Sequence, residues 1–182
     1  MKVLLINGSP NQTGCTYTAL HEVETTLQAN GIETELLYLG KKPIAGCIAC
    51  GACMNTGHCF RDDLVQEIQK RLDEFDAIVI GSPVYYSAPT GQLVSFLNRL
   101  FFATENRMAG KLGASVVSCR RGGASATFEQ LNQYFTIANY YCPIKILQSH
   151  KIRADFICEV SPFSLDFSRQ TIKSNYGQKY TF

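Results

Sequence analysis

The chain has 182 residues, of which 46% are hydrophobic and 18% are charged. This length suits a single domain, and this composition is too apolar for a disordered chain. Seventeen basic and fifteen acidic residues leave a net charge of +2, which gives no electrostatic reason to expect a nucleic-acid partner.

The start of the chain lacks the features of a targeting signal. Its apolar run, Lys2–Asn7, breaks at Gly8-Ser9-Pro10, before a secretory h-region could form. No apolar stretch approaches the ~20 residues that span a bilayer, so we expect no membrane partner. We therefore expect a cytoplasmic protein. In a reducing cytosol, the clustered members of its eight cysteines are better suited to metal binding or redox chemistry than to disulfides.

Hydrophobic patterning predicts strands that alternate with helices. In chain order, the predicted elements are a strand at Lys2–Asn7, a helix at Thr16–Asn30, a strand at Ile32–Leu39, a helix from Asp62 to Leu72, a strand at Asp76–Gly81, a helix at Thr90–Phe102, a strand at Leu112–Ser118, a helix at Thr127–Ala138 and a strand at Pro143–Leu147. This alternation predicts a parallel sheet with right-handed crossovers.

Three loops with informative sequences follow the first, third and fourth strands. They are Gly8–Thr16, Ser82–Pro89 and Cys119–Gly123. In an open parallel sheet, ligands bind beyond the carboxyl ends of the strands. The three loops therefore predict one shared site.

The first of these loops suits a phosphate group. It offers the hydroxyls of Ser9, Thr13 and Thr16 together with backbone N–H groups at the start of a helix. It matches neither the P-loop nor the Gly-x-Gly-x-x-Gly pattern. The alternative is a plain helix start, capped by Thr13 or Thr16.

The other two loops suit a planar, electron-rich ligand. Tyr85 and Tyr86 lie between two prolines and predict a stiff aromatic shelf on which a heterocycle could stack. Arg120 and Arg121 could face a phosphate or the edge of a reduced ring. The alternatives are tyrosines that pack on neighbouring helices and arginines that are simply solvated.

A compact cysteine set is the strongest single motif. Cys47, Cys50, Cys53 and Cys59 have the spacing C-x2-C-x2-C-x5-C. Four closely spaced thiolates are typical of a [4Fe–4S] cluster, whereas zinc more often takes two separated pairs. The alternatives are unmetallated cysteines and a zinc-stabilised binding module.

Together these motifs resemble the flavodoxin-like NAD(P)H-dependent FMN reductases, and more narrowly their iron–sulfur flavoprotein branch. The resemblance rests on Asn7-Gly8-Ser9-Pro10, on Gly81–Tyr86, on Arg120–Gly123 and on the cysteine set before Asp62-Asp63. It implies a doubly wound α/β sheet of order 2-1-3-4-5 with FMN at the switch point. It covers about residues 1–139.

The resemblance also implies a set of cofactor-binding residues. Those for FMN are Ser9, Asn11, Gly14, Cys15, Thr16, Pro83, Val84, Tyr85, Tyr86, Ser87, Arg120, Arg121, Gly122 and Gly123. Those for the cluster are Cys47, Cys50, Cys53 and Cys59. No catalytic side chain is expected, because hydride transfer to a flavin needs no side-chain acid or base.

The C-terminal part departs from the family pattern. After residue 139 the final helix expected from the family is not evident, and the chain contains no Trp. We expect a single flavodoxin-like domain over residues 1–182 whose segment 140–182 is diverged or has an altered reading frame.

The predicted function is an NAD(P)H-dependent oxidoreductase. NADPH or NADH would reduce bound FMN, and the electrons would pass, directly or through a [4Fe–4S] cluster, to a small molecule or a redox protein. The alternative is an FMN and iron–sulfur electron carrier without NAD(P)H activity. The family resemblance implies a homodimer or homotetramer.

Overall fold

One sheet organises the fold in the computed structural model, which describes residues 1–104, 107–151 and 153–160. The strands of this described part lie in the order β2-β1-β3-β4-β5-β6. Their bounds are β1 (Lys2–Asn7), β2 (Glu33–Tyr38), β3 (Ala77–Pro83), β4 (Leu112–Cys119), β5 (Tyr141–Lys151) and β6 (Arg153–Val160). The helices are α1 (Cys15–Ala29), α2 (Cys53–Thr56), α3 (Leu64–Arg71), α4 (Gly91–Thr104) and α5 (Ala124–Ile137), with a 3-10 turn at Leu72–Glu74.

The predicted doubly wound order is confirmed. Strands β1 to β5 are parallel in the order 2-1-3-4-5, which is the flavodoxin-like arrangement. The chain leaves β1 for β2 on one side and then returns to pair β3 on the other side. This reversal is a topological switch point, where open α/β sheets bind their ligands.

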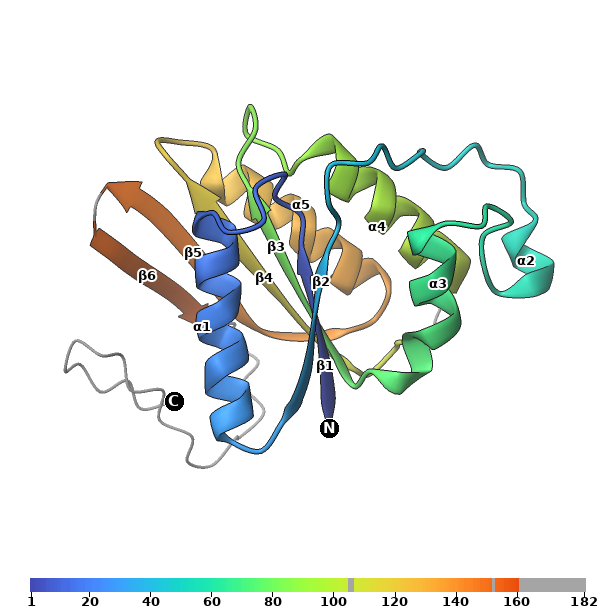
Figure 1. Cartoon of the computed structure of the whole chain (residues 1–182), viewed down its shortest axis with the longest axis horizontal. Coiled ribbons are helices and arrows are strands. Elements are labelled where there is room, and N and C mark those ends of the chain that lie inside the picture. The colour runs from blue at the N-terminus through green and yellow to red at the C-terminus, as the bar shows by residue number, and fades with distance from the viewer. Residues whose placement is uncertain (105–106, 152, 161–182) are drawn as a thin grey trace.

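Helices cover both faces of the sheet (Figure 1). Helix α1 lies on one face, and α3, α4 and α5 lie on the other. The strand sequences explain this, because alternate residues of a strand point to opposite faces. In β1, Val3 and Leu5 pack with Leu20 of α1, whereas Leu4 and Ile6 pack on the other side.

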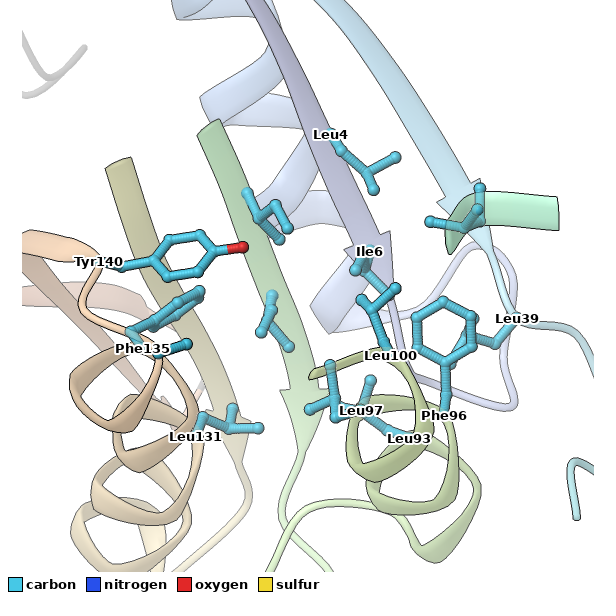
Figure 2. Close-up of a cluster of buried hydrophobic side chains, with 14 of the residues drawn as sticks. Leu4, Ile6, Leu39, Leu93, Phe96, Leu97, Leu100, Leu131, Phe135 and Tyr140 are labelled. Atoms are coloured by element: carbon cyan, nitrogen blue, oxygen red, sulfur yellow. The ribbon is translucent and has the colours of Figure 1, made fainter. Parts of the chain in front are cut away.

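The larger of the two cores lies between the sheet and helices α3, α4 and α5. Figure 2 shows Leu4 and Ile6 of β1 in the same cluster as Phe96 of α4 and Phe135 of α5. All four side chains are fully buried. This core fixes the ends of β1 and β3 and the start of α4, where the candidate site lies.

The structure adds one strand that the sequence did not predict. Strand β6 pairs antiparallel with β5, from Ile144 opposite Val160 to Lys151 opposite Arg153. Strand β5 extends beyond the predicted Pro143–Leu147 at both ends. Residues 161–182, which are most of the segment predicted to be diverged, lie outside the described residues.

The helices that the structure describes give no sign of a membrane span. None of them is long and apolar enough to cross a bilayer.

Candidate functional site

Three loops meet at the carboxyl edge of the sheet (Figure 1). The Gly8 amide after β1 donates to the Gly81 carbonyl of β3 at 2.8 Å, and the Thr90 hydroxyl donates to the Gly8 carbonyl at 2.7 Å. Gly123 lies against Ser87, since a Cβ atom on this glycine would be 2.6 Å from Ser87 Oγ. The loops after β1, β3 and β4 thus form one surface at the switch point.

The β1–α1 loop is held in shape by its own hydrogen bonds. The Ser9 amide donates to Asn7 Oδ1 at 3.0 Å, and the Asn11 amide donates to Ser9 Oγ at 3.1 Å. The Tyr38 hydroxyl donates to the Pro10 carbonyl at 2.8 Å. Ser9 is buried. Its oxygen accepts one hydrogen bond, and its hydroxyl proton has no acceptor among the hydrogen bonds of the described residues.

An open hollow lies at the start of α1. Its lining residues are Asn11, Gln12, Thr13, Gly14, Tyr38 and Lys41. Gly14 is the N-cap of α1, and no side chain caps this helix. The alternative in which Thr13 or Thr16 caps the helix is therefore wrong. Uncapped N–H groups beside a lysine favour an anion.

Cys15 and Thr16, two of the predicted phosphate ligands, differ in their exposure to solvent. Cys15 is exposed at the first position of α1. Thr16 is buried, and its Oγ1 is 2.7 Å from Ser118 Oγ of β4. The Thr16 hydroxyl thus bonds within the protein, while its amide stays at the N-terminus of the helix.

The β3–α4 loop carries the two predicted tyrosines on a tight turn. Tyr85 and Ala88 exchange backbone hydrogen bonds of 2.8 and 3.0 Å. Tyr85 is half exposed, and Tyr86 is fully exposed. Tyr86 and Ser87 have φ angles of 50° and 61°, a region that costs non-glycine residues free energy and often marks functional sites. Pro83 and Val84 lie half-buried at the base of the turn.

The β4–α5 loop brings two arginines to the same edge. Arg120 and Arg121 are exposed, and neither has an acidic partner among the described residues. Gly122 is exposed as well, and Gly123 has a φ of 88° as the N-cap of α5. The loop can therefore present positive charge to a ligand held by the other two loops.

The four predicted cluster cysteines line one pocket, beside α4. Cys47 and Cys50 are exposed, Cys53 and Cys59 are half-buried, and all four are free thiols. Burial raises the pKa of the Cys53 thiol, and the charges of the other three cysteines raise it further. In the described part of the chain, no three His, Cys, Asp or Glu side chains are grouped to hold a metal ion. The four thiols thus have the number and the donor type that a [4Fe–4S] cluster needs. They border one pocket but are not grouped around a single metal position.

A buried arginine that the sequence reading did not identify joins this pocket. Arg99 of α4 is only 2% exposed. It pairs with Asp63 through Nη1 at 2.6 Å and Nη2 at 2.9 Å. It also donates to Cys59 Sγ from Nε at 3.3 Å and from Nη2 at 3.1 Å. The sequence held one sign of this role: Arg99 is a charged residue among the apolar residues of the predicted Thr90–Phe102 helix.

Asp63 has two roles at this point. Its Oδ1 accepts from the Val65 and Gln66 amides at 3.2 and 3.4 Å, so it caps α3. Burial is the largest single influence on its carboxyl and raises the pKa. The hydrogen bonds and positive charge of Arg99, together with the hydrogen bonds from the Gln66 and Val65 amides, outweigh burial and hold that pKa below its ordinary value. The carboxylate is therefore charged beside the cysteine pocket.

Two glutamines hold the backbone of Cys59. The Cys59 amide donates to Gln69 Oε1 at 2.7 Å, and Gln66 Nε2 donates to the Cys59 carbonyl at 2.8 Å. Both glutamines are buried on α3. Gln69 Nε2 also donates to the Arg99 carbonyl at 2.6 Å. The last cysteine of the set is thereby fixed to both α3 and α4.

Comparisons with known proteins agree with this arrangement. A family model described as NADPH-dependent FMN reductase matches residues 1–148. An iron-sulfur flavoprotein of Methanocaldococcus jannaschii is 35% identical over an alignment of 142 residues. The match covers 75% of this chain and 72% of that protein.

Two solved structures are similar in fold. A flavodoxin from the domain Archaea superposes with a TM-score of 0.56 at 15% identity, covering 84% of this chain and 87% of that one. An NADH:FMN oxidoreductase superposes with a TM-score of 0.61 at 14% identity, covering 81% of this chain and 75% of that one. The fold, the family match over residues 1–148 and the relative at 35% identity lead to one conclusion: the chain belongs to the NADPH-dependent FMN reductase family and, within it, to the iron–sulfur flavoprotein branch.

Proposed function

We propose that the chain is an oxidoreductase that binds FMN at the switch point, accepts hydride from NADPH or NADH, and passes electrons to a small-molecule or protein acceptor. The observation that carries this proposal is the meeting of the loops after β1, β3 and β4 at one edge. When bound, FMN supplies two-electron chemistry with a nicotinamide, and a [4Fe–4S] cluster supplies one-electron chemistry toward the acceptor.

The β1–α1 loop would hold the phosphate of FMN. The hollow at the start of α1 combines uncapped N–H groups with Lys41 at its rim. The residues that would contact the phosphate lie in the loop and first turn at this helix start: Ser9, Asn11, Gly14, Cys15 and Thr16. The loop suits one terminal phosphate, because it lacks the glycine pattern with which pyrophosphate-binding loops hold FAD.

The other two loops would hold the ring. Tyr85 and Tyr86 are exposed enough to stack on a flat heterocycle, and Pro83, Val84 and Ser87 shape the turn that carries them. Arg120 to Gly123 would close the far edge of the ring. Exposed guanidinium groups there would stabilise negative charge on a reduced ring.

The cysteine pocket would hold the cluster through Cys47, Cys50, Cys53 and Cys59. Four thiols border one pocket, and a cationic side chain donates hydrogen bonds to one of them. Short wrapping segments with φ above zero at Ala49, Gly51 and Gly57 bring the backbone around this pocket. Such turns suit three cysteines at two-residue gaps around one face of a cubane.

Two measurements test this function. Anaerobic NADPH or NADH should bleach the yellow absorption of the FMN-loaded chain, and the flavin released by denaturation should be FMN. Bleaching by a chemical reductant but by neither nucleotide would favour the electron carrier without NAD(P)H activity. Release of FAD as the main flavin would contradict the assignment of the phosphate loop.

A separate experiment tests the cluster. Anaerobic reconstitution with iron and sulfide should give broad absorption near 400 nm and about four irons per chain. Cys50→Ala should lose this iron. Cys119→Ala is the matched control, because Cys119 is buried in the main core away from the cysteine pocket and its variant should keep the iron. Less than about one iron per unaltered chain would contradict the cluster and leave the FMN proposal standing.

A further inference from the structure

We propose that Arg99 is a positioning residue of the cysteine pocket: it fixes the Cys59 sulfur in place and donates hydrogen bonds that favour negative charge on that sulfur. The inference rests on the function proposed above, in which Cys59 is a cluster ligand. It concerns a side chain on α4, outside the cysteine segment.

The first support is that every N–H donor of the Arg99 guanidinium has a hydrogen-bond partner. An arginine has five N–H donors in a rigid fork. Nη1 donates to Asp63 and to the Ala45 carbonyl, Nη2 donates to Asp63 and to Cys59, and Nε donates to Cys59. All five donors therefore have a partner, and the planar group has no freedom to turn without breaking several bonds.

The second support is the choice of acceptor. A neutral thiol is a weak hydrogen-bond acceptor, whereas bonds to an ionised partner are roughly twice as strong. Two of the five donors nevertheless point at the one sulfur of Cys59, at 3.3 and 3.1 Å. Placing a buried cation in this way is favourable where the sulfur carries negative charge, as a metal-bound thiolate does.

The third support is that Cys59 is held more firmly than its companions. Its amide and carbonyl bond to Gln69 and Gln66, and its sulfur bonds to Arg99. Cys47 and Cys50 are exposed. The pocket therefore has one preset ligand, fixed to helices α3 and α4, around which the other three can close.

This arrangement has a consequence for electron transfer. Reduction of a cluster adds negative charge, and hydrogen bonds to its sulfurs are among the factors that set its reduction potential. Donors from a buried guanidinium should make the cluster easier to reduce. A purely structural Arg99–Asp63 pair would stabilise the fold without affecting this potential.

The experiment compares anaerobically reconstituted Arg99→Gln, Arg99→Lys and the unaltered chain. The control is Arg71→Gln. Arg71 forms an equally bidentate pair with Glu35, at 2.9 and 2.7 Å, and its ion pairs among the described residues are with Glu35 and Glu74, not with a cysteine. Three properties are measured. They are the iron content per chain, the folding of the chain by circular dichroism, and the reduction potential of the cluster by a redox titration followed near 400 nm and by electron paramagnetic resonance.

We expect the cluster of Arg99→Gln to be harder to reduce. At a fixed applied potential, its ratio of reduced to oxidised cluster should fall about tenfold, which is about 59 mV for one electron. Arg99→Lys should give a smaller shift, since it keeps a cationic donor and loses the fork. Arg71→Gln should titrate like the unaltered chain.

The outcomes separate this inference from the function on which it rests. If Arg99→Gln does not fold, the reduction potential of Arg99→Lys tests the inference in its place. A folded Arg99→Lys chain that loses its iron, while Arg71→Gln keeps it, also supports the positioning role. Unshifted potentials in both Arg99 variants would overturn the role of Arg99 alone. No iron in the unaltered chain would overturn the cluster, and the role of Arg99 with it.

Discussion

Thr16 Oγ1 and Ser118 Oγ lie 2.7 Å apart in a buried hydrogen bond that joins the first turn of α1 to the end of β4. The two residues are 102 positions apart in the chain, yet both lie at the carboxyl edge of the sheet, Thr16 in the first turn of α1 and Ser118 near the end of β4. The bond fixes the direction of the helix whose N-terminus faces the proposed phosphate.

The first prediction concerns this bond. Thr16→Val keeps the shape of the side chain and leaves the Ser118 hydroxyl buried without its partner, which should lower the free energy of unfolding by about 1–3 kcal/mol. FMN affinity should change less, because the Thr16 amide is retained. Urea unfolding and fluorescence titration with FMN measure the two effects. Thr16→Ser should restore the stability. Full stability with lost FMN binding would show that the hydroxyl holds the phosphate instead.

The second prediction tests the charge at the hollow. Lys41 lines it together with Asn11 and Gly14, whereas Lys42 does not. Lys41→Gln should weaken FMN binding by about 0.2–1 kcal/mol, and added salt should reduce this difference. Lys42→Gln should bind FMN like the unaltered chain. Riboflavin, which has no phosphate, should bind the Lys41→Gln and unaltered chains equally. An equal loss for riboflavin would place Lys41 against another part of the ligand.

The third prediction concerns the aromatic turn. Tyr86→Ala should weaken FMN binding by about 0.5–1.5 kcal/mol beyond the lost contact area, because the exposed ring is free to stack on a flavin. Ile137→Ala is the control, since Ile137 is also largely exposed but lies at the end of α5 away from the three loops. Isothermal titration compares the two variants. If Tyr86→Ala and Tyr85→Ala both bind FMN normally, the ring lies elsewhere.

The fourth prediction is a pH dependence of stability. The pKa of Asp63 is below its ordinary value in the folded chain, because Arg99 and the capped amides of α3 together outweigh the effect of burial. The stabilisation by this pair is therefore complete above the ordinary carboxyl pKa of about 3.9 and is lost as the pH falls through the lower, folded-state value. Thermal unfolding from pH 7 down to acid should show this loss.

Variants of the two adjacent acids isolate the contribution of Asp63. Asp63→Asn leaves Arg99 buried without its ion pair and should cost about 2–3 kcal/mol at pH 7, less than a fully buried pair because the Asp63 side chain is 34% exposed. This variant should also lose part of the acid dependence. Asp62→Asn, at an exposed position, should behave like the unaltered chain. Identical acid profiles for Asp63→Asn and the unaltered chain would contradict the pKa assignment.

The sequence by itself determined the local elements and the edge at which the ligand loops lie. Strand β1 has the predicted bounds, Lys2–Asn7, because a short apolar run bounded by Gly8 and Pro10 has few alternatives. The order of alternating strands and helices also restricts the topology, since parallel crossovers are right-handed and ligands bind at the carboxyl ends of strands. The four cysteines were found because their spacing is local.

Only the tertiary structure decided which side chains meet across the chain. The contact of Arg99 with Cys59 joins residues 40 positions apart, and the contact of the Thr16 hydroxyl with the Ser118 hydroxyl joins residues 102 positions apart. Strand β6 likewise depends on its partner β5. Hydrophobic periodicity indicates which face of a helix or strand is buried. It does not indicate which partner a buried polar group will have. That group forms hydrogen bonds with the groups that the fold brings within about 3 Å of it, and the packing of the whole domain sets those distances.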